Sequence, residues 1–212
     1  MQTRYLEPEA VAMVANALKG HSRTIWLLMN EVGLRISDAV KIKHCHISLD
    51  GVLWWTSSKT GKTASRKLSG ELLLLLDPLE DRPNTYIFQS KSRKAEHIHR
   101  STVYRHIKKA CKKIGIDPEG IGTHSARKSF AVKDFRENGL GRTMFDLQHS
   151  SAATTLLYAL SDNPIPRILK KISLIDEQIQ ELYDICDMIC NELWPPDEPV
   201  PYKLKEEKNA GD

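Results

Sequence analysis

The chain has 212 residues, enough for one compact domain of ordinary size, and its formal net charge of +4 is modest. It contains no run of 18 or more apolar residues and no signal segment, so we expect no membrane insertion and a cytosolic protein. A disulfide framework is not expected in such a chain. Reduced thiols in or near the core are predicted for Cys45, Cys111, Cys186 and Cys190.

The first 42 residues predict three helices separated by glycines. Pro8 marks the start of the first helix, and Gly20 stops it. Ser22 is expected to cap the second helix, which Gly33 ends. The apolar residues that recur at helical spacing are Val11, Val14, Ala15, Leu18, Ile25, Leu28, Met29, Ala39, Val40 and Ile42.

Arg35 stands at the start of the short third helix, on a turn between packed helices. Asp38 follows in the first turn of that helix. An acidic residue at this position can simply favour the helix dipole, without any functional role.

The segment His44-Cys45-His46 has the residue types of a zinc site. We reject this interpretation, because two ligands on alternate sides of an extended segment need partners at metal spacing. No second Cys/His pair is evident, so no metal site is predicted.

The sequence pattern changes at Gly51 from helical spacing to one typical of strands, which predicts a β-hairpin. Residues 52–56 are β-branched and aromatic, and residues 64–68 can pair back across a polar turn that has Lys59 at its tip. A helix over 71–76, a strand over 86–88 and a capped helix over 101–114 are predicted to follow.

Positive charge is concentrated in residues 91–113, which carry nine Lys or Arg against one acid, Glu96. Most of this charge lies on one face of the predicted helix 101–114, opposite Val103, Ile107 and Cys111. Such a face suits a phosphate backbone, since each neutralised phosphate releases counterions. The alternative is an ordinary solvated helix face.

The stretch from Gly122 to Tyr158 carries residue types that suit attack on a phosphodiester. Arg127 can hold phosphate oxygens bidentately, and His124 and His149 can donate or transfer a proton near neutral pH. The Tyr158 hydroxyl can become a covalent nucleophile. Each residue alone is more often ordinary surface or core, so the signal is their fixed order.

This order resembles the tyrosine recombinase (phage integrase) family. The family's His-x-x-Arg motif matches residues 124–127, and its Gly-His-Ser segment with a tyrosine nine residues on matches His149 and Tyr158. The Gly-Leu-Arg-x-Ser-Asp/Glu motif matches residues 33–38, and the hairpin lysine matches the segment 58–62. The resemblance implies an α+β fold, mainly α-helical with a small antiparallel β-sheet, like that of a tyrosine recombinase catalytic domain.

The resemblance also implies a set of cationic groups for the transition state. Arg35 and Arg127, together with His149 and His124, would stabilise negative charge on the phosphate oxygens. Asp38 is similar to the carboxylate that orients the first arginine in the family. No metal ion or other cofactor is implied.

The remaining roles concern bond making and proton transfer. Tyr158 would attack the phosphorus, His124 would accept its proton, and Lys59 would protonate the departing 5′-oxygen. Lys62 is a less favoured substitute for Lys59. The residues expected to contact DNA outside the catalytic centre are Lys62, Arg100, Arg105, Lys108, Lys109 and Lys112.

Three positions depart from the family pattern without removing a catalytic group. Ala126 replaces a common leucine, Lys128 stands where a histidine is frequent, and Gln148 stands where a glycine usually precedes the histidine. Glycine often fills that last position with a positive φ, so Gln148 is expected to change the turn that aims His149.

Full-length relatives usually carry a separate helical core-binding domain, whereas this chain reaches Arg35 almost at once. We expect either a catalytic fragment or a naturally short recombinase similar to the fimbrial-switch inverting enzymes. The short form is favoured, since Met1 opens the chain and residues 6–10 look like the start of the catalytic domain.

Three regions are predicted: a catalytic domain over 1–162, a C-terminal helix over 163–194 and a disordered tail over 195–212. The helix repeats apolar residues at alternating three and four positions for about four heptads, which favours pairing with another helix. It can equally fold back on its own domain, because further apolar residues widen the stripe. The resembled family acts as tetramers, so a homotetramer on DNA is expected.

Together these features predict a site-specific DNA recombinase or integrase that cleaves and rejoins double-stranded DNA through a 3′-phosphotyrosine. The alternatives are a catalytically silent DNA-binding regulator of the same fold and a type IB topoisomerase. The filled catalytic positions argue against the first, and the small size and the spacing around His149 argue against the second. Accessory DNA-bending proteins and a cytoplasmic, nucleoid-associated location, in a bacterium or for a phage-encoded protein, are further expectations.

Overall fold

The computed structural model describes residues 3–76, 83–92, 95–149, 151–159 and 184–185. The chain divides into two units, Met1–Asn163 and Pro164–Asp212, and the described elements below belong to the first. The predicted C-terminal helix and tail lie outside the described residues, apart from Asp184 and Ile185. The elements are α1 (Pro8–Ala17), α2 (His21–Val32), α3 (Ile36–Ala39), the 3₁₀ helix η1 (His44–His46), β1 (Val52–Thr56), β2 (Thr63–Lys67), α4 (Gly70–Leu76), α5 (Arg100–Lys113), α6 (Thr123–Asp146) and α7 (Ala152–Ala159).

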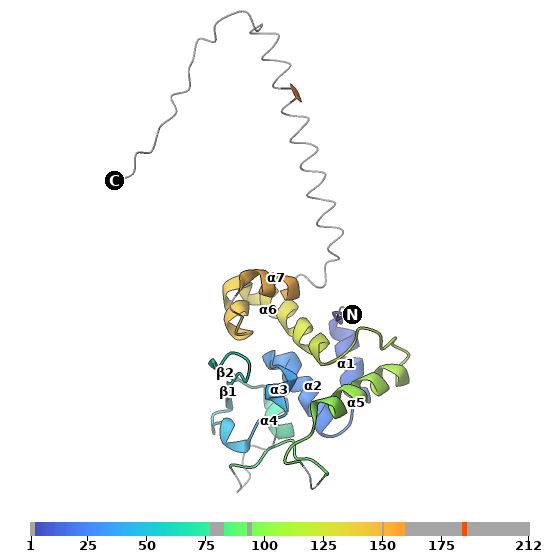
Figure 1. The fold of residues 1–212 in the computed structure, drawn as a ribbon, viewed down its shortest axis with the longest axis vertical. Helices are drawn as coiled ribbons and strands as arrows, with labels where there is room; N and C mark the ends of the chain where they lie inside the picture. The colour runs from blue at the N-terminus through green and yellow to red at the C-terminus, as the bar shows by residue number, and fades with distance from the viewer. Residues whose placement is uncertain (1–2, 77–82, 93–94, 150, 160–183, 186–212) are drawn as a thin grey trace, which may run out of the picture. The chain divides into compact units, whose positions relative to one another are not determined.

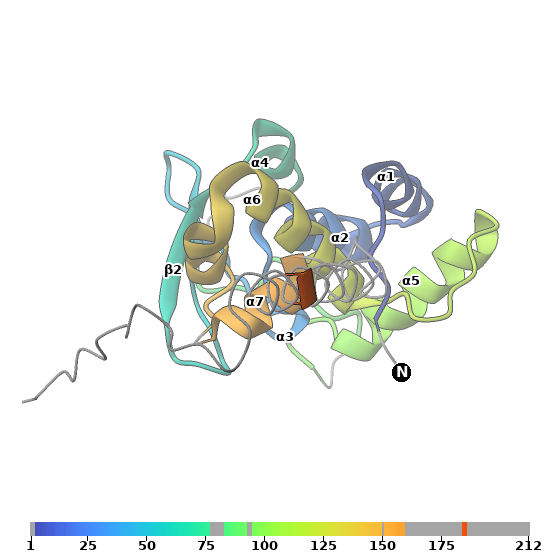
Figure 2. The ribbon, with the colours of Figure 1, turned by 90° about the horizontal axis from the view of Figure 1, so that it is seen from above.

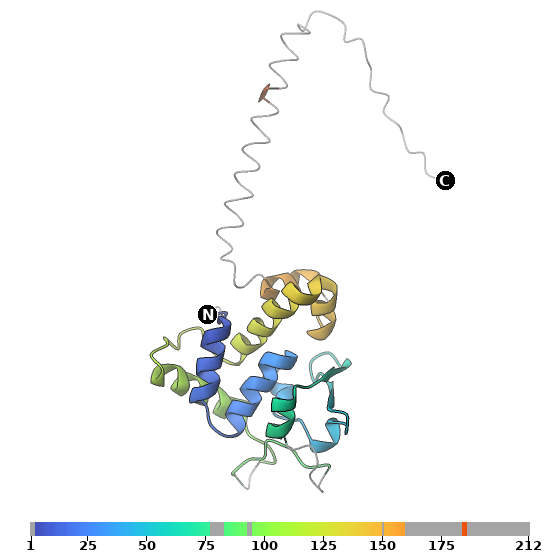
Figure 3. The ribbon, with the colours of Figure 1, turned by 180° about the vertical axis from the view of Figure 1, so that it is seen from behind.

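The first unit is mainly helical with one two-stranded antiparallel sheet, which confirms the predicted α+β class. Helix α2 is its centre and packs against α1, α3, α4, α5 and α6. The β-hairpin and α5 lie on opposite sides of the helical core (Figures 1 and 2). Helix α7 packs against α6 (Figure 3). No helix among the described residues combines the length and apolar character needed to cross a membrane.

The apolar face predicted for the first two helices is the one that is buried. Val14 on α1 and Leu18 at its C-cap are buried, and Ile25, Leu28 and Met29 are almost fully buried on α2. Burying such a side chain contributes roughly 1.5–3 kcal/mol, so this face accounts for the packing of α2 at the centre.

The prediction that Ser22 caps α2 is wrong. Gly20 occupies the N-cap position with a positive φ of 53°, so the helix begins at His21 and Ser22 falls inside its first turn. There Ser22 is buried, and its Oγ lies 2.7 Å from Nδ1 of His106 on α5. The serine therefore joins α2 to α5 instead of capping the start of α2.

Gly33 ends α2 in the left-handed conformation, with φ 75°. A Cβ atom at this position would lie 2.3 Å from Cδ1 of Phe130, on α6. Glycine is therefore required both by the backbone conformation and by the close approach of α6. The turn delivers Arg35 to the N-cap of α3 in an extended conformation.

We expect Gly33→Ala to lower the free energy of unfolding by about 2–5 kcal/mol, through backbone strain and overlap with Phe130. Gly20→Ala is the matched control, because Gly20 also has a positive φ but no atom within 4 Å of the added Cβ. Gly20→Ala should lower the free energy of unfolding by only about 1–2 kcal/mol. Urea denaturation measures both values, and equal losses would contradict the role of Phe130.

The predicted hairpin is confirmed. β1 pairs antiparallel with β2, in a register that places Val52 opposite Lys67 and Thr56 opposite Thr63. Leu53 is buried and Trp54 is exposed, as the two faces of a half-buried strand require. The turn between the strands contains Lys59.

Three local predictions need correction. Residues 86–88 form no regular strand, because Tyr86 makes only an isolated bridge to Lys43, although Phe88 is fully buried. The segment 44–46 is a 3₁₀ helix instead of an extended segment, with Nδ1 of His46 accepting from the Lys43 amide. Cys45 on this helix is exposed, whereas Cys111 on α5 is buried as expected. Cys186 and Cys190 lie outside the described residues.

The hairpin is anchored to α6 by a network of charged side chains. Arg66 on β2 donates to Oδ1 of Asp134 at 3.1 Å and lies 3.5 Å from Oδ2 of Asp146. Both carboxylates are buried, and the Arg66 guanidinium also stacks 4.7 Å from the centre of the Phe130 ring. Removing one partner of such a buried pair is strongly destabilising, so the network holds the hairpin beside α6.

Candidate active site

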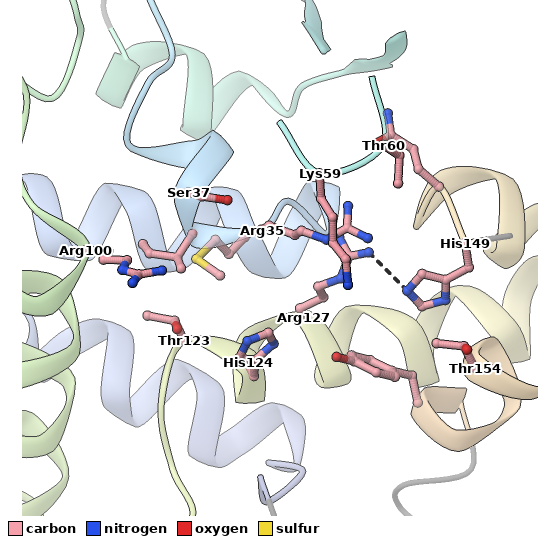
Figure 4. A pocket seen from close by; sticks show the side chains of 14 residues that line it. Arg35, Ser37, Lys59, Thr60, Arg100, Thr123, His124, Arg127, His149 and Thr154 are labelled. Carbon is pink, nitrogen blue, oxygen red and sulfur yellow. Dashed lines mark hydrogen bonds between the residues drawn. The ribbon is translucent and has the colours of Figure 1, made fainter. Parts of the chain in front are cut away.

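All six predicted catalytic residues line one cavity of about 440 Å³. They come from the α2–α3 turn, the hairpin loop, the first turns of α6, the segment after α6, and α7. Figure 4 shows the labelled side chains of Arg35, Lys59 and Arg127 converging at the centre of this cavity. The six residues are Arg35, Lys59, His124, Arg127, His149 and Tyr158.

Arg127 is the most buried of these groups, with only 3% of its surface exposed. Its guanidinium donates to the carbonyl oxygen of Gly33, to that of Leu147 at 2.6 Å, and to Nε2 of His149 at 3.2 Å. Burial, and then the nearby positive charge of Arg35, lower the pKa of Arg127 to about 10. The group is still a cation at neutral pH, and it ties the end of α2 to the end of α6.

Arg35 is held more loosely than Arg127. It is half-buried at the N-cap of α3, and its Nη1 donates to Oγ of Ser57 at 3.1 Å. Ser57 is almost fully buried at the start of the hairpin loop. The first arginine is therefore connected directly to the loop that carries Lys59.

His149 is locked between two partners. Nε2 receives the hydrogen bond from Arg127, and Nδ1 lies 3.1 Å from Oγ1 of the buried Thr155. Arginine has no acceptor, so Nε2 must accept and Nδ1 must carry the proton in the neutral ring. Burial, followed by the charges of Arg127, Arg35 and Lys59, lowers the pKa of His149 to about 4.

We therefore expect the DNA-free protein to keep His149 neutral from pH 8 down to about pH 5. The folded pKa lies below the unfolded value of about 6.5, so the contribution to stability is complete above pH 6.5 and is lost as the pH falls toward 4. Imidazole ¹⁵N NMR would follow the titration. Arg35→Ala should raise the pKa of His149, and Arg136→Ala, on the exposed face of α6, should not. A titration near pH 6.5 in the unaltered protein would contradict this description.

His124 lies in the first turn of α6, with an exposed side chain at the edge of the cavity. Partial desolvation, and then the charges of Arg127, Arg35, Lys128 and Lys59, lower its pKa. The neutral imidazole, which has a free acceptor site, is therefore the form favoured at neutral pH.

Tyr158 is half-buried on α7 and faces His149 edge to face, with ring centres 5.4 Å apart. Its ring packs against the small apolar cluster of Phe130, Ala131 and Leu147. The ammonium group of Lys128, which donates to the carbonyl of Thr3, lies 6.0 Å from the centre of the Tyr158 ring. The tyrosine ring is thus positioned by α6 and by the histidine.

The loop that carries Lys59 is held in place at its start by hydrogen bonds to Asp38 and to Ser57. Asp38 accepts from the amide of Ser58 at 3.1 Å and also from the Ser58 hydroxyl. Oγ of Ser57 accepts weakly from the amide of Lys59 at 3.4 Å. The hydrogen bonds described for the Asp38 carboxylate thus run to serines, and they hold the loop beside Arg35.

The residues predicted to contact DNA are spread more widely. Arg100, at the start of α5, lines the same cavity, and Lys62 lines a neighbouring pocket of about 320 Å³. Lys108 already has partners within the protein, because its ammonium group donates to the carbonyl of Pro118 and lies over the Tyr104 ring. Exposed on α5 are Arg105, Lys109 and Lys112.

Two residues of the site, Ser57 and Thr155, were missed by sequence reasoning. Both are buried hydroxyls that bond to a catalytic candidate, Arg35 in one case and His149 in the other. Ser57 directly precedes the matched hairpin segment, and Thr155 lies between the matched histidine and tyrosine. Their position beside these motifs was the only available signal.

Several solved recombinases share this fold. XerA recombinase matches with a TM-score of 0.62 and 22% identity over 82% of this chain and 64% of that chain. A lambda integrase (75–356) dimer bound to a COC′ core site matches with a TM-score of 0.61 and 21% identity, over 75% and 60%. A lambda integrase tetramer bound to a Holliday junction matches with a TM-score of 0.61 and 21% identity, over 77% and 50%.

The fold is therefore that of a tyrosine recombinase catalytic domain. The chain belongs to the phage integrase family, whose family model matches residues 4–163. It spans half to about two thirds of the length of the three recombinase chains above, and identities near 20% establish the shared fold alone. No significant match was found among curated proteins.

Proposed function

We propose that this protein is a site-specific DNA recombinase that cleaves and rejoins double-stranded DNA through a 3′-phosphotyrosine intermediate. The observation that carries the proposal is the cavity lined at once by Tyr158, by Arg35 and Arg127, by two histidines and by Lys59. A tyrosine, a proton acceptor, a proton donor and fixed cations are the groups that metal-independent phosphodiester transfer needs.

The two arginines act on the transition state. Attack on the phosphodiester places extra negative charge on the equatorial oxygens of a five-coordinate phosphorus, and preorganised donors stabilise that charge. Arg127 is fixed by its bonds to Gly33 and Leu147, so it needs little rearrangement to hold an oxygen. Arg35 and an N–H of the His124 ring complete the set, and His149 accepts from Arg127 and so holds that guanidinium in place.

Proton transfers accompany the two bond changes. The Tyr158 oxygen bonds to phosphorus while neutral His124 accepts the phenolic proton, and the bond from phosphorus to the 5′-oxygen breaks as Lys59 donates a proton to that oxygen. The phosphotyrosine keeps the energy of the broken bond. A 5′-hydroxyl from another strand can therefore reverse the step and complete strand exchange.

The proposed partner is double-stranded DNA, bound by a homotetramer together with accessory DNA-bending proteins. The DNA complexes of lambda integrase, one dimeric and one tetrameric, support DNA binding by an oligomer, by similarity of fold. The cavity alone is too small for a duplex, so the exposed cations of α5 would supply further backbone contacts.

A covalent trapping experiment tests the function. Footprinting on DNA that flanks the gene would locate the binding site, and a suicide substrate nicked beside the cleavage position would then be incubated with the full chain. We expect a protein–DNA adduct on a denaturing gel, with DNA linked through its 3′-phosphate. Tight, sequence-specific binding without an adduct would instead indicate a silent regulator of the same fold.

We predict that Lys109→Gln with Lys112→Gln flattens the salt dependence of DNA binding. Each lost phosphate contact should reduce the slope of log K against log salt by about 0.9. The control is the pair Lys19→Gln and Lys133→Gln, which removes two exposed lysines from α1's end and α6. Fluorescence anisotropy at several salt concentrations measures the slopes. Equal slopes in all three proteins would place the DNA away from α5.

A further inference from the structure

Gln148 occupies a backbone position that normally requires glycine. It is the only non-glycine residue with a positive φ, 53°, in the part of the chain that the structure describes. It directly follows the C-cap of α6, Leu147. The amide of Gln148 bonds to the carbonyl of Phe145, and the amide of His149 bonds to that of Met144 at 3.0 Å. This is the Schellman pattern of helix ends, in which the left-handed residue is most often glycine.

The side chain of Gln148 gives a reason for the exception. It is buried, and its Nε2 donates to the carbonyl oxygen of Lys62 at 3.1 Å. The same carbonyl accepts from the amide of Ser57 at 2.9 Å and so closes the hairpin loop. A glycine at position 148 would relieve the backbone but would leave this bond unmade.

The loop with Lys59 is therefore held at both ends by parts of the active site. Its first residues are bound through Ser57 to Arg35 and through Ser58 to Asp38. Its last residue, Lys62, is bound through Gln148 to the turn that delivers His149. Lys59 lies between these two anchors, and both Lys59 and Gln148 line the cavity.

We infer that Gln148 is a positioning residue that places the hairpin loop, and with it the Lys59 ammonium group, against the leaving 5′-oxygen. The inference rests on the proposed function. Gln148 touches neither substrate nor reacting atoms in this role, and it acts through the loop.

Two variants separate the hydrogen bond from the backbone strain. Gln148→Met keeps a side chain of similar length without an N–H donor, and Gln148→Gly removes the side chain but suits a positive φ. Both retain the catalytic groups. Thermal unfolding would establish that each variant is folded, and anisotropy would establish that it binds the footprinted DNA site as the unaltered protein does.

The decisive readout compares two leaving groups on that site. With the ordinary substrate, the bond from phosphorus to the 5′-oxygen breaks and the oxygen takes a proton from Lys59. With a 5′-bridging sulfur, the bond from phosphorus to sulfur breaks and a thiolate leaves without needing the proton. We expect both Gln148 variants to cleave the oxygen substrate about 10- to 100-fold more slowly, and the sulfur substrate within a few-fold of the unaltered protein.

Lys59→Ala should show the same rescue by sulfur, whereas Arg35→Ala should not. Oxygen cleavage at the normal rate in both Gln148 variants would overturn the inference, and so would an equal loss on the two substrates. Failure of the proposed function gives a different result, since the unaltered protein would then form no adduct with either substrate.

Discussion

Tyr158→Phe is expected to abolish the covalent protein–DNA adduct and to leave DNA affinity unchanged. The substitution removes one oxygen atom, and the proposed nucleophile is that atom. The aromatic ring should stay in place, because its contacts with His149 and with the cluster of Phe130 and Leu147 do not involve the hydroxyl. Suicide-substrate trapping and anisotropy would measure adduct and affinity in the same preparation.

Tyr104→Phe is the control for this experiment, because Tyr104 is partly exposed on α5 and does not line the cavity. It should form the adduct at the normal rate. Tyr183, the other competitor in the sequence, lies outside the described residues. An adduct that survives in Tyr158→Phe would move the nucleophile elsewhere, and mass spectrometry of the trapped peptide would identify it.

The second large effect concerns Arg35 and Arg127. Their substitutions should slow cleavage alike, because both act on one phosphate, but should differ in their effect on the stability of the protein. Arg35→Ala and Arg127→Ala should each slow adduct formation by at least about 100- to 1,000-fold, with little loss of DNA affinity. Arg127→Ala should also lower the free energy of unfolding by about 2–5 kcal/mol. It leaves the buried carbonyls of Gly33 and Leu147 without their donor.

Arg35→Ala should lower the free energy of unfolding by less than about 1.5 kcal/mol. The hydrogen bond described for Arg35 joins a half-buried side chain to one hydroxyl. Arg136→Ala, on the exposed part of α6, serves as the neutral control for both measurements. Urea denaturation and single-turnover trapping give the two quantities. Parallel losses of cleavage and affinity would mean that the arginines are ordinary DNA-backbone contacts.

The tertiary arrangement also changes how the His149 region is understood. The sequence predicted that Gln148 changes the turn that aims His149, because glycine is usual there. This prediction is wrong, since Gln148 keeps the positive φ of 53° and the helix-end hydrogen bonds that glycine favours. The sequence offered no sign that the glutamine amide reaches the carbonyl of Lys62, 86 positions away in the chain. A contact of that sequence separation depends on how the hairpin packs beside α6.

Local patterns predicted most of the fold, because each rests on neighbours within a few residues. Helical spacing identified the buried faces of α1, α2 and α5, and alternation identified the hairpin. The errors lie at Ser22, Cys45 and residues 86–88. At Ser22, Gly20 takes the N-cap position, and the serine hydroxyl bonds instead to His106 on α5.

The ordered motifs were enough to indicate the family and the six candidate residues of the site, since each motif is short and its residue types are fixed by chemistry. The partners of those residues could not be inferred in the same way. The neutral state of His149, the burial of Arg127 and the bond from Asp38 to the hairpin loop depend on groups from distant segments. Charge, desolvation and hydrogen bonding act over a few ångströms of space, and folding alone decides which segments come within that range.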